Sequence, residues 1–177
     1  AEQSHVIAEA NTKIAQASLI NTMMKSLTST NAQERKLAVD AVLIALPEQG
    51  PTLVRTIAQS DEDKSVQAAA RNSLETRVTA LIRQLFSTDP RERIGAAQDL
   101  VTGWRNDASV VLELVTFATQ NKDNANGVYN SVVVLNEFTL RALQAQRAEV
   151  LGFVDVAKTT GAKTATVASA LAGRLGT

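Results

Sequence analysis

The residues of this chain that could do chemistry are few and scattered. The single histidine, His5, has no cysteine and no Asp–His or Glu–His ligand pattern beside it, whereas zinc sites and serine–histidine triads need several converging groups. Cysteine is absent, which excludes disulfides, thiol nucleophiles and thiolate metal sites. We therefore expect His5 to lie on a helix surface, and we expect the chain to bind no metal and no cofactor.

Carboxylates and glycines give no stronger signal of catalysis. The acidic run at residues 61–63 could hold a cation, but it directly precedes a helical pattern, where acidic groups interact favourably with the helix dipole. We interpret this run as a helix cap. The eight glycines are scattered singly, so no phosphate-binding loop is present. Because no nucleophile–base pair occurs either, we predict that the chain is not an enzyme.

The charges of the chain cancel overall. Eighteen basic residues balance eighteen acidic ones, which removes the broad positive field of a nonspecific nucleic-acid binder. The middle of the chain is locally richer in arginine, at Arg71, Arg77, Arg83, Arg91, Arg93 and Arg105. Acidic residues are interspersed there, and aromatic residues that could stack on bases are few. Nucleic acid is therefore a less favoured alternative to a protein partner.

The most unusual stretch is "NKDNANGVYNSVVVLNEF", residues 121–138, which holds the only tyrosine and several asparagines. If a helix begins near residue 124, then Asn126, Tyr129 and Asn130 project from neighbouring positions at spacings of three and four. Tyrosine combines a large contact area with a hydroxyl group, which suits an interface. We predict a partner-binding site at these three residues. The alternative is that the asparagines cap the helix and Tyr129 fills a seam between helices.

Composition and pattern both favour helices as the elements that position these residues. The chain contains 28 alanines, six aromatic residues and three prolines, which predicts an all-α protein. A frame of a capping residue followed by residues four, seven and eleven positions later recurs with starts 32, 26 and 35 residues apart. The four frames are Asn31, Arg35, Ala38, Val42; Asp63, Gln67, Ala70, Leu74; Asp89, Arg93, Ala96, Leu100; and Asn124, Val128, Ser131, Leu135.

Each frame predicts a helix with one apolar face, followed by a second helix. Second helices begin after the breaks at Pro47, Gly50 and Pro51 and at Asn106 and Asp107, whereas residues 64–86 contain no turn signal and form either one long helix or two. We predict one helical-repeat domain over residues 1–177, with repeats at 29–60, 61–87, 88–121 and 122–160. Residues 1–28 form a leading helix and residues 161–177 a closing helix, which cover the two ends of the stack.

Two of these frames resemble a known family of repeats. "DEDKSVQAAARNSL" and "DPRERIGAAQDL" are similar to the Asp-x-x-Val-Arg-x-x-Ala type of helix in HEAT-like repeats, and Val54-Arg55 resembles the Val-Arg pair of that family's second helix. The resemblance spans roughly residues 31–158, although Val128 stands where the earlier frames have Arg or Gln. It implies a right-handed α-α superhelix of about four hairpins with capping helices at both ends, of the kind that binds other proteins.

The function that these observations favour is a non-catalytic scaffold that binds a protein or peptide on one face of the helical stack. A structural or oligomerisation module is the main alternative, because Ile14, Met23 and Met24 of the leading helix could pack between chains. No stretch approaches the ~20 apolar residues of a membrane span. The first ten residues show no signal peptide, and the compartment stays open between the cytoplasm, which is slightly favoured, and an exported location.

Overall fold

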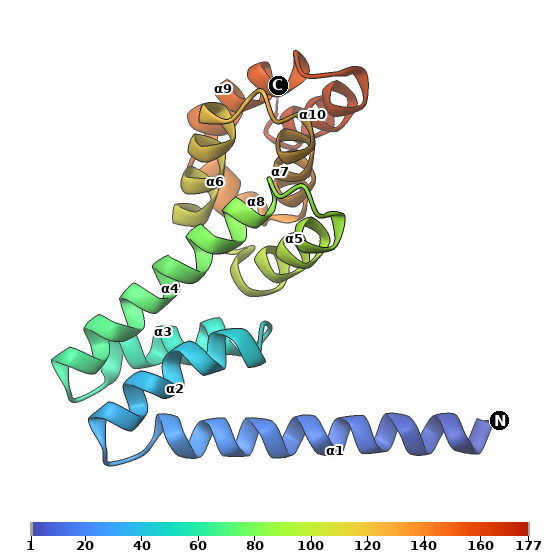
Figure 1. Ribbon diagram of the computed structural model, residues 1–177. Coiled ribbons are helices and arrows are strands. Elements are labelled where there is room, and N and C mark those ends of the chain that lie inside the picture. The colour runs from blue at the N-terminus through green and yellow to red at the C-terminus, as the bar shows by residue number, and fades with distance from the viewer. Residues whose placement is uncertain (1, 177) are drawn as a thin grey trace. The chain divides into compact units, whose positions relative to one another are not determined.

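The chain is helical throughout the part that the structure describes. The computed structural model covers the backbone of residues 2–176 and the side chains of residues 11–176, and within that range it has ten helices and no strand (Figure 1). The helices are α1 (Glu2–Leu27), α2 (Ala32–Ala45), α3 (Gly50–Ser60), α4 (Lys64–Gln84), α5 (Pro90–Trp104), α6 (Ala108–Gln120), α7 (Ala125–Glu137), α8 (Leu140–Gln144), α9 (Arg147–Lys158) and α10 (Ala162–Arg174). The all-α prediction is confirmed. The side chain of His5 lies outside the described residues.

All four predicted helix starts occur where the frame places them. Asn31, Asp89 and Asn124 are N-caps whose side-chain oxygens accept hydrogen bonds from main-chain N–H groups of the first turn. Asp63 does the same for α4, because its Oδ1 accepts from the Ser65 N–H at 2.7 Å. Each of these bonds satisfies a donor that the helix itself leaves without a partner. The local sequence therefore determines where these helices begin.

A second repeated hydrogen bond follows the cap. In the first three frames, the side chain four residues after the cap donates to the main-chain oxygen two residues before it. The three bonds join Arg35 Nη1 to the Ser29 oxygen at 2.7 Å, Gln67 Nε2 to the Asp61 oxygen at 2.7 Å, and Arg93 Nη1 to the Ser87 oxygen at 2.8 Å. Val128 has no donor with which to repeat this bond. In the fourth frame the cap itself turns back, since Asn124 Nδ2 donates to the Phe86 oxygen at 2.9 Å.

The apolar face that the frame predicts is buried. The small residue at offset seven is buried in every frame, and the apolar residue at offset eleven is buried in three of the four. The buried residues are Ala38, Ala70, Ala96 and Ser131 at offset seven, and Val42, Leu100 and Leu135 at offset eleven. Leu74 is half-buried. Small side chains at offset seven allow neighbouring helices to approach closely.

The second and fourth predicted repeats differ from simple hairpins. α4 is one continuous helix, which decides between the two possibilities for residues 64–86, and no glycine or proline interrupts it. Residues 122–160 contain three helices, because Thr139 caps the additional short helix α8. The hairpin prediction is wrong for these two segments. The leading and closing helices occur as predicted, with α10 followed by Gly176 at a positive φ of 79°.

Two compact units divide the chain, Ala1–Leu74 and Glu75–Thr177, with the boundary inside α4. In the first unit α2 packs against α1 and α3. In the second unit α5 packs against α7 and α7 against α10, while α6 packs against α9. These contacts form two rows of helices, which also meet where α7 packs against α6 and α10 against α9. The prediction of a single repeat domain stays a prediction.

Candidate functional site

The predicted binding segment occupies the first two turns of α7, and its start is fixed by aromatic packing. Asn124 Oδ1 accepts from the Gly127 N–H at 2.9 Å. The Gly127 backbone lies directly against the Phe86 ring, so that a Cβ atom at residue 127 would overlap the ring. Phe86 in turn packs edge-on against Phe117, with 5.0 Å between the ring centroids. Glycine is thus needed here for close packing, and the beginning of α7 is held rigidly.

The three predicted site residues have three different environments. Asn126 is exposed, whereas Tyr129 and Asn130 are half-buried. Asn130 Nδ2 donates to the Leu85 oxygen at 3.3 Å, so its amide is partly used in holding α7 to the residues after α4. Tyr129 faces α10, where Lys163 Nζ lies 4.5 Å from the ring centroid. The structure therefore brings together Tyr129 and Lys163, and it gives Asn130 a contact within the fold.

Lys163 is a member of this surface that the sequence pattern does not reveal. It lies 34 positions after Tyr129, in a closing helix that has no recognisable binding motif. A cation over an aromatic face is attracted by the ring quadrupole, by about 0.5–1 kcal/mol at an exposed site. The pairing of α7 with α10 brings the two residues together. Only a correct prediction of that helix pairing could have identified Lys163 beforehand.

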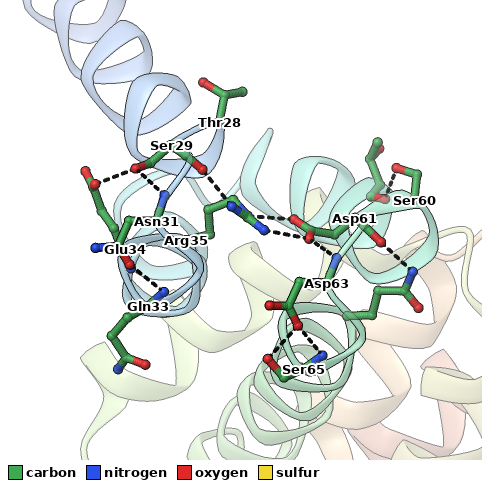
Figure 2. A network of polar contacts seen from close by, with 12 residues as sticks. Thr28, Ser29, Asn31, Gln33, Glu34, Arg35, Ser60, Asp61, Asp63 and Ser65 are labelled. Atoms are coloured by element: carbon green, nitrogen blue, oxygen red, sulfur yellow. Dashed lines mark hydrogen bonds and ion pairs between the residues drawn. The ribbon is translucent and has the colours of Figure 1, made fainter.

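The acidic run at residues 61–63 holds the first unit together at the ends of its helices (Figure 2). Asp63 caps α4, as predicted. Asp61 accepts two hydrogen bonds from the guanidinium of Arg35, from Nε at 2.9 Å and from Nη2 at 3.0 Å. These bonds lower the pKa of the Asp61 carboxyl, and bonds from Ser65 lower the pKa of Asp63. Both carboxylates are thus stabilised in the charged form by contacts within the fold.

Three of the six arginines in the middle of the chain bind other parts of their own unit. Arg71 donates to the Ala58 oxygen at 3.0 Å, and Arg77 pairs with Asp99 at 2.8 Å. Arg93 donates to two main-chain oxygens before α5. Trp104 is 2 % exposed, as its predicted place in the core requires. These arginines therefore do not present a free row of guanidinium groups for phosphates.

Within residues that the structure describes, no cluster of His, Asp or Glu is arranged to hold a metal ion. No helix in that part of the chain is long and apolar enough to cross a membrane. Comparison of the chain with protein-family models, with curated proteins and with solved structures finds no match. The site must therefore be interpreted from its own geometry.

Proposed function

We propose that this chain is a non-catalytic scaffold that binds another protein or a peptide on one face of its helices, over the surface shared by α7 and α10. The observation that carries the proposal is the half-buried Tyr129 ring with the Lys163 ammonium 4.5 Å from its centroid. Asn126 stands exposed one turn before Tyr129. An aromatic ring beside a cation and an amide offers apolar contact area together with hydrogen-bond donors and acceptors, which is the mixture found at interface centres.

The rigid start of α7 supports this choice of surface. The Asn124 cap and the packing of Gly127 on Phe86 fix the helix that carries Tyr129. A partner that binds here loses little conformational entropy in ordering the site, because the site is already ordered. Asn130 contributes by holding α7 in place through Leu85, and its amide retains further hydrogen-bonding capacity for a partner.

For the architecture, we propose a right-handed stack of HEAT-like units with capping helices. Its support is the capping frame that recurs in four helices, together with the rows α5–α7–α10 and α6–α9 in the second unit. Stacked helices of this kind offer an extended surface to a partner. A nucleic-acid partner is less favoured, because three of the central arginines bind main-chain oxygens or a carboxylate of their own unit.

The proposal is tested by capturing partners from an extract of the source cell on immobilised chain. Tyr129→Ala and Lys163→Ala should each lose the same captured protein, because each removes half of the ring–cation pair. Leu112→Ala, at an exposed position of α6, is the matched control and should retain it. Loss of the captured protein in all three variants, or in none of them, would exclude the α7–α10 surface.

Self-association is a second candidate function, supported by one feature of α1. Ile14 is 67 % exposed on this helix, although large aliphatic side chains are usually covered. Met23 and Met24 are half-buried near the end of the same helix. A second copy of the chain is a natural cover for Ile14. A molar mass that rises with concentration would support this candidate.

A further inference from the structure

The first unit has an uncovered apolar surface on α2. Leu37, Ala41 and Ile44 follow one another at spacings of four and three, so they lie along one side of the helix, which we name the outer stripe. Leu37 and Ile44 are each 67 % exposed, and Ala41 is exposed as well. The opposite side of α2 carries the buried residues of the unit. The outer stripe is thus additional to the face that the fold itself uses.

The second uncovered surface belongs to α1. Every residue from 11 to 19 is exposed, and we name this range the free section of α1. In Figure 1 the N-terminal part of α1 extends beyond α2 and α3 of its own unit. Most helices in proteins owe their stability to packing of an apolar side, and the free section offers Ile14 without a covering residue. Both surfaces would be covered if they met.

The charges beside the two surfaces are complementary. Asp40 and Glu48, both exposed, flank the outer stripe. The free section carries a single charged residue, the exposed Lys13, which directly precedes Ile14. A basic residue beside one apolar side chain therefore matches acidic residues beside the other surface. Complementary charges of this kind favour one orientation of association and disfavour others.

We propose that the free section of α1 binds the outer stripe of α2 in a second copy of this chain, and that the contact is reciprocal. Ile14 lies over Ala41, between Leu37 and Ile44 of the other copy, and Lys13 pairs with Asp40. The inference rests on the self-association candidate and specifies its interface. Because each chain has one free section and one outer stripe, a twofold dimer covers both surfaces of both chains and leaves none for further growth.

Helix geometry permits the ion pair when the two helices run antiparallel. If Ile14 is level with Ala41, the preceding residues, Lys13 and Asp40, project to the same side of the helix pair. At 1.5 Å rise per residue they are about 3 Å apart along the helix axes, which the long lysine side chain spans easily. Alanine at the centre of the outer stripe allows the helices to approach closely, with large apolar side chains above and below it.

Sedimentation equilibrium of the full chain, over roughly a hundredfold range of concentration, tests the proposal. The chain should show a reversible monomer–dimer equilibrium. Ile14→Glu and Leu37→Glu should each weaken dimerisation by roughly tenfold or more, because each places a charge in an apolar contact. Ile94→Glu is the matched control, since Ile94 is 59 % exposed on α5, and it should dimerise like the parent chain. Circular dichroism should show all three variants folded.

Two further experiments identify the interface rather than dimerisation alone. An equal mixture of Ile14→Glu and Leu37→Glu chains should dimerise more than either variant alone, because the mixed dimer keeps one intact contact. Lys13→Glu and Asp40→Lys should each weaken the dimer, and the double variant should restore it. A monomer at every concentration would refute self-association itself. A dimer that Leu37→Glu leaves unchanged would refute the outer stripe while self-association stands.

Discussion

The guanidinium of Arg35 binds the carboxylate of Asp61 through two parallel hydrogen bonds, Nε to Oδ2 at 2.9 Å and Nη2 to Oδ1 at 3.0 Å (Figure 2). The third nitrogen of the same group donates to the Ser29 oxygen at 2.7 Å. One arginine on α2 therefore ties the turn before its own helix to the residue that follows α3. Both side chains are largely shielded from solvent, at 7 % and 8 % exposure. Two-pronged pairs of this kind fix geometry as well as charge.

This pair predicts a pH dependence of stability. The hydrogen bonds from Arg35 lower the pKa of Asp61 in the folded chain, below its unfolded value of about 3.9. A carboxyl whose pKa is lowered by folding stabilises the fold above the unfolded pKa, and this contribution disappears as the pH falls through the folded pKa. Unfolding in urea, followed by circular dichroism, should therefore show stability that is flat near neutral pH and falls below about pH 5.

Asp61→Asn identifies the contribution of this carboxyl. The variant should be less stable than the parent chain at pH 7, and its stability should fall less between pH 7 and pH 3. Glu48→Gln, at an exposed carboxyl in the turn before α3, is the control and should follow the parent curve. Parallel curves for the parent chain and Asp61→Asn would show that the Arg35–Asp61 pair does not contribute to the acid dependence.

The helices could be predicted from sequence because their signals are local. Asn31, Asp63, Asp89 and Asn124 each bond to N–H groups within three residues, so the cap and the helix that follows are specified together. The break at Pro47 and Gly50 is local in the same sense. Residues 122–160 were harder, because the short helix α8 begins at Thr139, whose N–H and hydroxyl both donate to the Arg105 oxygen. That contact spans 34 positions and leaves no periodic pattern.

The candidate site was only partly predictable for the same reason. Spacing on one helix identified Asn126, Tyr129 and Asn130 as neighbours. It could not show that Lys163 lies over the Tyr129 ring or that Asn130 donates to Leu85, 45 positions earlier. Likewise, the frame marked Arg35 as a repeated position, but its partner Asp61 belongs to the next frame. Partners of this kind depend on which helices pack together.

The two glycines within α7 and α9 should respond oppositely to alanine. At Gly127 a Cβ atom would overlap the Phe86 ring, so Gly127→Ala should destabilise the second unit by about 1–3 kcal/mol through overpacking. At Gly152 a Cβ atom meets nothing within 4 Å, so Gly152→Ala should stabilise α9 by about 0.5–1 kcal/mol through better helix propensity. Urea unfolding followed by the fluorescence of Trp104 measures both. Equal effects at the two positions would contradict the packing of Gly127 on Phe86.

Stability measurements should also separate Asn130 from Tyr129. Asn130→Ala removes the bond to the Leu85 oxygen and should cost about 1 kcal/mol, because a partly buried acceptor loses its donor. Lys163→Met keeps the aliphatic contact with Tyr129 and removes the charge, so it should cost no more than about 0.5–1 kcal/mol, the size of an exposed cation–π contact. A loss of stability larger for Lys163→Met than for Asn130→Ala would show that the ring–cation pair is mainly structural.

Removal of the last four helices should unfold what remains of the second unit. A chain that ends at Gln120 keeps α5 and α6 but loses α7 and α9, against which these helices pack. Leu100, Leu114 and Val115, each at most 3 % exposed in the full chain, then face solvent. Since each buried aliphatic side chain contributes about 1.5–3 kcal/mol, the loss exceeds what two remaining helices can offset. The shortened chain should bind a hydrophobic dye, emit Trp104 fluorescence at longer wavelength and melt without a cooperative transition. A sharp melting curve with unshifted Trp104 emission would show instead that α5 and α6 fold without α7 and α9.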